Sequence, residues 1–480
     1  MPFTEFTCRS GGSNLYAGTL DGSAEASTTP LVTYTNGGWN SGTGVFTPAS
    51  GNPVSAGVAV GNFVSVYTDA ASAPTGFVAR VTAVSSTTIT LSTTAKSGTA
   101  PTTAGTGITA VVGGAWQGPN GTSSFPFNFA ASPMTNSTGD SPRINFKNDQ
   151  TYSITAAMTS TLVGPVAFQG YTTTFGDRGR ATIDGGTTGA SYVLLTVSSN
   201  GGKCYRDLIF QNNGATGSAN GLASSGGNRN VYDSVVVNSV RGIGLSIGDN
   251  SVVVRCEAYA CNQSNTSNCG GFSVGGATLS FCVSHDNTGS NSFGFGTAAA
   301  NQVVSTFVNC VADTNGGIGF SLQGTQQISQ VISCTSYNNT SDGIRISSSA
   351  GGAAYVQNSI LSNNGGWGIN NSSAVTCGIT NNAYLSNTSG QVTANVASVF
   401  YNDGGVTLSG APFTNAASGD FSLNNTAGAG ASCRGAGIGT FPTTQGGYGS
   451  TLGYPDIGAV QHQDAGGAAG MLFIPCLAGV

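Results

Sequence analysis

The sequence predicts an all-β protein built around a right-handed parallel β-helix, a solenoid of stacked coils, behind a small N-terminal antiparallel β domain. Three observations support this fold class. Seven segments recur at intervals of 23–28 residues, six of them carry asparagine five residues after their start, and 7% of residues are charged while 39% are hydrophobic. Short apolar runs with few helix formers between them favour strands over helices. An antiparallel sandwich does not repeat in register at this spacing, so we expect coils stacked about 4.8 Å apart.

Residues 1–115 precede the repeat and are predicted to form a small β domain for docking or assembly. Two runs of alternating apolar residues, 58–67 and 76–84, are typical of antiparallel strands. A linker rich in Gly, Thr and Pro follows and continues to about residue 140. The β-helix is expected from 141 to 410.

The repeated segments predict which residues stack. They begin at Asp207, Asp233, Cys256, Cys282, Cys310, Cys334 and Asn358. Equal positions in successive parallel coils lie above one another, and stacked asparagine side chains satisfy the backbone groups of a turn. We therefore expect a ladder of amides formed by Asn212, Asn238, Asn287, Asn315, Asn339 and Asn363.

Four of these segments begin with cysteine, in a chain that has 11 cysteines and no C-x-x-C pair. Side chains stacked in parallel lie side by side, a geometry that disfavours disulfides between neighbouring coils. The spacing does not suit zinc. We expect a ladder of buried, unbridged thiols at Cys256, Cys282, Cys310 and Cys334, and we expect neither a metal nor a cofactor.

Acidic residues that suit catalysis are scarce, because the chain has 19 in all. Asp207 and Asp233 share one position in adjacent segments, so their carboxyls are expected about 5 Å apart, a separation that glycoside hydrolases use. The same position continues as cysteine in later segments, which places it inside the coil. A buried polar ladder is therefore the alternative to a catalytic pair. No other catalytic residue is assigned.

A second shared position carries His285 and Asp313. The other segments have Phe210, Tyr259 and Tyr337 there. A row of exposed aromatic and polar side chains suits a sugar-binding stripe. Ordinary packing of surface side chains explains the same pattern, and the sequence leaves both interpretations open.

Residues 411–480 are rich in glycine and are predicted to cap the solenoid and end in an apolar tail. The tail, 468–480, is shorter than the ~20 residues of a membrane span and suits burial against a neighbouring chain. The first residues, Met1–Arg9, lack the basic and apolar regions of a signal peptide. No cluster of Lys and Arg suits nucleic acid. We expect no signal peptide, no membrane span and no nucleic-acid partner.

The segment Pro455-Asp-Ile-Gly-Ala459 and the asparagine-terminated repeats resemble the right-handed parallel β-helix repeat superfamily, with its pectate-lyase-like fold. The order of β domain, linker, Gly170-Tyr-Thr opening and repeats also resembles bacteriophage virion and fibre proteins. The resemblance covers roughly residues 140–462. It implies the fold more specifically than the function, because this fold hosts enzymes, adhesins and inert spacers.

From the resemblance and the scarce acids we expect a structural virion protein of a bacteriophage: a fibre, spike or capsid-decorating protein without enzymatic activity. It would assemble in the host cytoplasm as a homo-oligomer, with a trimer among the options, and contact other virion proteins and host surface polysaccharide. One alternative is a polysaccharide-degrading tailspike or lyase, which needs an outward acidic cluster. The other is a bacterial surface adhesin or filament subunit, which needs an export signal.

Overall fold

The computed structural model describes residues 3–462 apart from 69–76, 98–100, 102–104, 124, 128–140, 161–164, 198–201, 225–228, 291, 298–302, 324–326, 348–351, 373–375, 395–398, 403–404 and 439–454. The predicted apolar tail, 468–480, lies outside the described residues, as does the linker from 128 to 140. Helical structure in the described part is limited to two 3-10 turns.

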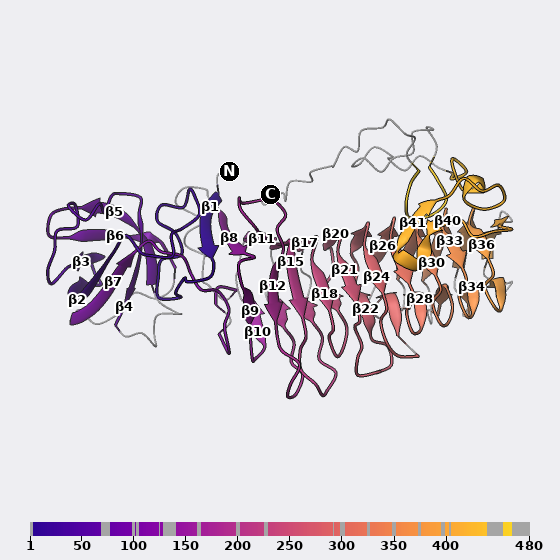
Figure 1. The fold of residues 1–480 in the computed structure, drawn as a ribbon, viewed down its shortest axis with the longest axis horizontal. Coiled ribbons are helices and arrows are strands. Elements are labelled where there is room, and N and C mark those ends of the chain that lie inside the picture. Colours follow the sequence, from indigo (N-terminus) through magenta and orange to yellow (C-terminus); the bar gives the residue numbers. More distant parts are fainter. Residues whose placement is uncertain are drawn as a thin grey trace.

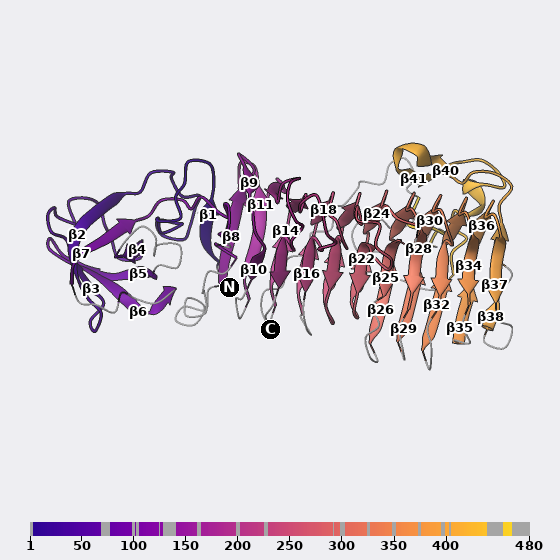
Figure 2. The same cartoon turned by 90° about the horizontal axis from the view of Figure 1, so that it is seen from below.

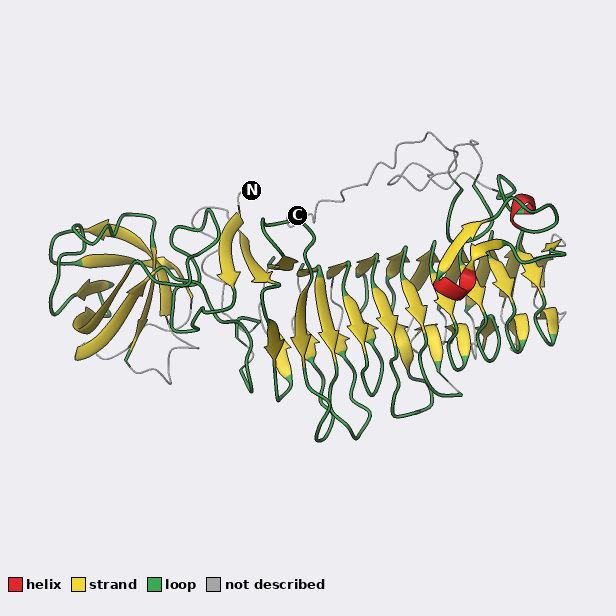
Figure 3. Cartoon of the chain, viewed as in Figure 1, coloured by secondary structure: helices red, strands yellow, loops and turns green. Residues whose placement is uncertain are grey.

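Three parallel sheets run the length of the solenoid, and successive coils add strands to each sheet in turn (Figures 1 and 3). The predicted fold class is confirmed.

The first sheet contains β1 (Phe3–Cys8), β8 (Ser141–Lys147), β11 (Ala167–Tyr171), β14 (Cys204–Arg206), β17 (Val231–Asp233), β20 (Val252–Val254), β23 (Thr278–Ser280), β26 (Val304–Val308), β29 (Ile328–Ile332), β32 (Ala353–Gln357), β35 (Thr376–Thr380) and β38 (Val399–Asn402). The second sheet contains β9 (Thr151–Ser153), β12 (Ala181–Asp184), β15 (Leu208–Gln211), β18 (Val236–Asn238), β21 (Glu257–Tyr259), β24 (Val283–His285), β27 (Val311–Asp313), β30 (Thr335–Tyr337), β33 (Ile360–Ser362), β36 (Ala383–Leu385) and β39 (Val406–Thr407). The third sheet contains β10 (Met158–Ser160), β13 (Leu195–Val197), β16 (Leu222–Ser224), β19 (Leu245–Ile247), β22 (Gly270–Val274), β25 (Phe293–Thr297), β28 (Ile318–Leu322), β31 (Ile344–Ile346), β34 (Trp367–Asn371) and β37 (Gly390–Ala394).

Each coil bends sharply on both sides of the second sheet, and single residues with left-handed backbone make the bends. The bend from the first sheet uses residues with φ between 49° and 56°: Asp207, Ser234, Arg255, Phe281, Asn309, Ser333, Asn358 and Asn381. The bend that leaves the second sheet uses residues with φ between 50° and 57°: Asn212, Ser239, Ala260, Asp286, Thr314, Asn338, Asn363 and Ser386. Asn and Asp tolerate this conformation better than most side chains do, which is one reason they recur here.

An amide ladder lies just inside the second bend. Asn287 Nδ2 donates to Asn315 Oδ1 at 2.7 Å, and Asn315 Nδ2 donates to Asn339 Oδ1 at 2.9 Å. The ladder continues through Asn364 to Asn387 at 3.0 and 2.9 Å. All these hydrogen bonds lie in or at the edge of the interior, where an unsatisfied amide costs about 1–3 kcal/mol.

Three of the predicted ladder positions are wrong. Asn212 and Asn363 are the left-handed bend residues themselves, one position before the ladder. Asn238 is the last residue of β18, and its side chain is not part of the ladder. The physical reason is that asparagine suits both the bend and the ladder, so an Asn-Asn pair does not reveal which member turns inward.

Glycine opposite the ladder leaves room for the stacked amides. A Cβ atom added to Gly294 would lie 2.9 Å from Asn315 Nδ2, and one added to Gly343 would lie 2.8 Å from Asn364 Nδ2. Both distances are shorter than ordinary van der Waals contact. The glycines that begin the third-sheet strands are therefore required by packing against the ladder.

The predicted thiols Cys256, Cys282, Cys310 and Cys334 are free and buried. They occupy the first inward position after the bend from the first sheet. Their Sγ atoms lie 3.3–3.6 Å from backbone carbonyl oxygens of their own and the preceding coil. Burial raises the pKa of Cys256, Cys282 and Cys310 well above the ordinary thiol value. Cys204, in contrast, forms a disulfide bond.

Before the solenoid, six antiparallel strands close into a small barrel. They are β2 (Val32–Asn40), β3 (Val45–Thr47), β4 (Phe63–Tyr67), β5 (Phe77–Val84), β6 (Ile89–Ser97) and β7 (Gly105–Val112). The chain does not enter this barrel directly, because β1 pairs in parallel with β8 and forms the first strand of the solenoid. Residues 3–8 thus belong to the β-helix, whereas the sequence assigned them to the N-terminal β domain.

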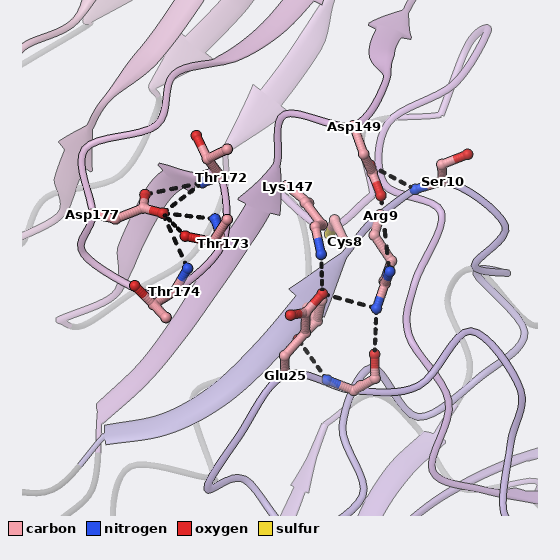
Figure 4. A network of polar contacts seen from close by, with 12 residues as sticks. Cys8, Arg9, Ser10, Glu25, Lys147, Asp149, Thr172, Thr173, Thr174 and Asp177 are labelled. Atoms are coloured by element: carbon pink, nitrogen blue, oxygen red, sulfur yellow. Dashed lines mark hydrogen bonds and ion pairs between the residues drawn. The ribbon is translucent and has the colours of Figure 1, made fainter.

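Charged side chains join this N-terminal part to the first coils (Figure 4). Glu25 Oε1 lies 2.8 Å from Arg9 Nη1 and 2.7 Å from Lys147 Nζ, which places one carboxylate between two cations. Nearby, the carboxylate of Asp177 accepts hydrogen bonds from the backbone of residues 172–174. Burial opposes ionisation of this carboxyl, but these N–H groups hold its pKa well below the usual value.

The C-terminal residues fold back over the outer face of the second sheet (Figures 1 and 2). A hairpin of β40 (Phe413–Asn415) and β41 (Asp420–Leu423) encloses the 3-10 turn η2 (Ala416–Ser418), and a second turn, η3 (Gly430–Ser432), follows. Phe413, Phe421 and Ile457 share one buried apolar cluster with Ile360 and Ala383 of the sheet. The cap therefore covers β33 and β36.

Candidate functional site

Two rows of side chains line the exposed part of the second sheet beside the cap. In the register of the strands, Glu257, Val283 and Val311 form one row. The other row is Tyr259, His285, Asp313 and Tyr337. The sequence-predicted stack of His285 and Asp313 with two tyrosines is thus present, and all four side chains are partly exposed. Phe210 is not in it, because it points into the core and Gln211 occupies its place.

His285 lies between two carboxylates. Its Nε2 is 3.1 Å from Glu257 Oε1 and its Nδ1 is 2.8 Å from Asp286 Oδ2. The imidazole ring also stacks on Tyr259, with centroids 5.0 Å apart. Burial lowers the pKa of His285, but the hydrogen bonds and charges of the two carboxylates outweigh it, so the net shift is upward. The hydrogen bond with His285 lowers the pKa of Glu257.

Asp313 lies in the next coil, and its pKa shifts in the opposite direction from that of Glu257. Burial and the negative charge of Asp286 raise the pKa of Asp313, against a hydrogen bond from Thr314 Oγ1 at 2.6 Å. One groove therefore contains one carboxyl with a raised pKa, Asp313, and one with a lowered pKa, Glu257. Environments that separate two carboxyl pKa values in this way are a feature of acid–base sites.

The cap converts this strip of sheet into a groove of about 800 Å³. Its floor is formed by β21, β24, β27 and β30. Its lining residues are Glu257, Val283, His285, Asp286, Val311, Asp313, Thr314, Tyr337, Asn338, Ala416, Ala417, Ser418, Gly419, Phe421 and Val460. The volume is that of an ordinary small-molecule or oligosaccharide site.

The candidate pair Asp207 and Asp233 lies elsewhere, at the bend between the first and second sheets. The two residues do not share a position, since Asp233 pairs with Arg206 and Asp207 is the bend residue that follows it. The prediction that Asp207 and Asp233 occupy the same inward column as the four cysteines is also wrong. That column has Leu208 and Val235 in these coils, and both are fully buried.

Arginines surround this aspartate pair. Arg206 Nε lies 3.2 Å from Asp207 Oδ2 and 3.5 Å from Asp233 Oδ2, and Arg255 Nη2 lies 2.6 Å from Asp233 Oδ1. Burial raises the pKa of Asp207 to about 6, against the lowering charges of Arg206 and Arg178. Asp207 is 1% exposed and Asp233 is 6% exposed, so a polymer cannot reach them. Their geometry is that of a structural ion-pair cluster at a bend.

Sequence reasoning missed Glu257 and Asp286 as members of the site. Glu257 sits one residue after a cysteine of the thiol column, and outward orientation follows from strand alternation. Asp286 is a bend residue next to His285. A search for acids within two residues of the His285 column would have found both.

Among the residues that the structure describes, no group of three or more His, Cys, Asp or Glu side chains is arranged to hold a metal ion. No helix in that part of the chain is long and apolar enough to cross a membrane.

Comparison with solved structures finds a pectate lyase and α-1,3-glucanases. The crystal structure of pectate lyase Pel9A matches 67% of this chain and 88% of its own, at 18% identity and a TM-score of 0.48. The catalytic unit of a GH87 α-1,3-glucanase from Streptomyces thermodiastaticus strain HF3-3 matches 78% of this chain and 86% of its own, at 11% identity and a TM-score of 0.32. No protein-family model and no curated protein matches the sequence.

These matches correct one expectation. The scarce acids predict a protein without enzymatic activity, whereas the matched structures are a pectate lyase and α-1,3-glucanases. They lend no support to the resemblance to virion proteins, which stays a prediction. At this low identity, the chemistry of the chain has to be argued from its own groove.

Proposed function

We propose that the groove beside the C-terminal cap binds a polysaccharide and that the protein hydrolyses its glycosidic bonds. The observation that carries the proposal is the pair of carboxyls in one groove, Asp313 with a raised pKa and Glu257 with a lowered pKa. A raised pKa keeps a proton available at a pH where the second carboxyl is ionised. Glycoside hydrolysis needs one group of each kind.

Asp313 takes the role of general acid. It donates its proton to the glycosidic oxygen as the bond from that oxygen to the anomeric carbon breaks. Glu257 takes the role of general base, removing a proton from the water whose oxygen bonds to the anomeric carbon. Strand β24 lies between the strands of the two residues, which favours the wider carboxyl spacing of inverting enzymes, about 6.5–9.5 Å, over the ~5 Å of retaining ones.

The remaining lining residues suit a sugar. Tyr337 lines the groove, and Tyr259 stacks on His285 in the same row without lining it. Both are partly exposed, and tyrosine rings pack on the apolar faces of sugar rings while their hydroxyls hydrogen-bond. His285, held by Glu257 and Asp286, supplies a positive charge beside both acids. The floor between the polar groups is apolar at Val283 and Val311. A small number of polar groups on an apolar floor is the usual composition of a ligand site.

The test is release of reducing ends from a panel of neutral and acidic polysaccharides by the purified protein. Wild type should degrade at least one of them. Asp313→Asn should lose at least 100-fold of that rate, the contribution of about 10²–10⁴ typical of general acid–base catalysis. Asp21→Asn, which removes an exposed carboxylate in the N-terminal part, should keep it. A wild type that degrades none of the panel, or an Asp313→Asn variant as active as Asp21→Asn, would overturn the proposal.

Attachment to a virion, assembly into oligomers and contact with host surface polysaccharide stay predictions. A polysaccharide-degrading tailspike would combine them with the activity proposed here.

A further inference from the structure

We propose that the groove admits only the end of a polysaccharide chain, so that the protein shortens its substrate from one terminus. The inference rests on the proposed function and adds the mode of attack. It follows from two adjoining walls that close the groove.

The first wall is the β40–η2–β41 hairpin, which packs on the outer face of β30. Phe413 and Phe421 pack edge-on against Tyr337, with ring centroids 5.7 and 5.6 Å from it. Ala416, Ala417 and Ser418 of the η2 turn line the groove above that ring. The hairpin lies beside β30 in both views of the fold (Figures 1 and 2).

Beyond this wall the two rows of the sheet continue but are no longer accessible. Ile360 and Ser362, which follow Thr335 and Tyr337 in register, are both fully buried. Leu385, one coil further, packs against the apolar cluster of the cap. A polymer lying along the sheet therefore has to stop at Tyr337.

The second wall is the segment 457–460, which runs along the bend between the first and second sheets. Gly458 N donates to Asn358 O at 2.7 Å, Ala459 N donates to Thr335 Oγ1 at 3.1 Å, and Asn309 Nδ2 donates to Ala459 O at 2.8 Å. These bonds attach the segment to three successive coils. Val460 at its end lines the groove. A polymer crossing the sheet from the opposite side has to stop at this segment.

The side opposite the second wall is the accessible one. Asp286, Thr314 and Asn338 form the rim there, and all three are exposed bend residues. A straight chain that enters over this rim at β27 or β30, or along the sheet from the Glu257 end, meets one of the two walls within the groove. A chain bound over Asp313 of β27 along either of these paths therefore contains a terminus.

Product analysis tests the inference separately from the proposed function. On the polysaccharide that wild type degrades, solution viscosity should fall slowly while reducing ends accumulate, and short oligosaccharides should be released from the start. A rapid loss of viscosity with products of random length would overturn the chain-end inference and leave the hydrolase proposal intact. No degradation at all would overturn both.

A shortened hairpin tests the wall itself. Replacing residues 416–419 by Asn-Gly removes the η2 turn and keeps Phe413 and Phe421, so the apolar packing of the cap is retained. With the shortened protein, the solution should lose more viscosity per reducing end released than with wild type. Thr414→Ala, at an exposed position of the same hairpin that does not line the groove, should leave this ratio unchanged. Unchanged products from a folded shortened protein would show that this wall does not set the mode of attack. If the shortened protein does not fold, the product pattern of wild type still decides.

Discussion

Glu257 Oε1 and His285 Nε2 lie 3.1 Å apart on the neighbouring strands β21 and β24, and Asp286 Oδ2 lies 2.8 Å from the other ring nitrogen of the same histidine. An ionised carboxylate accepts hydrogen bonds and does not donate them. Protons on both ring nitrogens satisfy both carboxylates at once, so the arrangement stabilises the imidazolium, in line with the raised pKa of His285. A positive charge is thus placed among the acids of the groove.

The first prediction concerns the pKa of His285. NMR titration should place it above the ordinary value of about 6.5, and Glu257→Gln should lower it because one of the two carboxylates is removed. A raised pKa in the folded state means that the stabilisation is complete at pH below the unfolded value and is lost as the pH rises through the folded value. An unchanged His285 pKa in Glu257→Gln would contradict the ion pair.

The second prediction is the pH dependence of the hydrolysis. Activity requires Asp313 protonated, so kcat/KM should fall as the pH rises through its raised pKa. It also requires Glu257 ionised, so kcat/KM should fall as the pH drops through its lowered pKa. A bell-shaped profile on the acidic side of neutrality is expected, and Glu257→Gln should remove its acidic limb from whatever activity remains. A rate that rises steadily from acid to alkaline pH would assign the acid role to another group.

The third prediction separates the ladder from the bend next to it. Asn364→Ala removes a buried amide that bonds both Asn339 and Asn387, and it should lower the free energy of unfolding by about 2 kcal/mol. Asn363→Gly removes the preceding side chain at φ 57°, a conformation that glycine adopts freely, and should change stability by about 1 kcal/mol or less. Urea denaturation measures both. Equal effects would mean that the amide ladder adds no stability of its own.

The fourth prediction concerns the thiols. After unfolding without a reducing agent, alkylation and mass spectrometry should find Cys256, Cys282, Cys310 and Cys334 all modified, because all four are free. In the folded protein the same reagent should leave them unmodified, since they are buried. A disulfide between any two of them would contradict the structure.

The regular spacing of the repeats was enough to predict the parallel β-helix, because a ladder of stacked positions leaves the same residue types at the same interval. It was not enough to predict the register of every coil. The two bends of a coil are five residues apart in every coil from Asp207 onward, so Asp207 and Asp233 stand one and two positions before the thiol column, and aspartate and asparagine suit bends as well as ladders. An alignment without gaps therefore moved these residues to the wrong position.

The groove was harder to predict than the fold. His285, Asp313 and the tyrosines could be placed in one row from strand alternation alone. The walls come from Phe413, Phe421 and Val460, which belong to a glycine-rich segment without repeats, and nothing in its sequence shows that it folds back over the second sheet. The burial that raises the pKa of Asp313 in that groove was therefore also beyond sequence reasoning.

The most direct test of the central claim is a crystal structure of Asp313→Asn with an oligosaccharide of the polysaccharide that wild type degrades. The sugar should occupy the groove over β24, β27 and β30, with its terminal unit against Tyr337 and a glycosidic oxygen within hydrogen-bonding distance of residue 313. An oligosaccharide bound on another face of the solenoid, with the groove empty, would contradict the account.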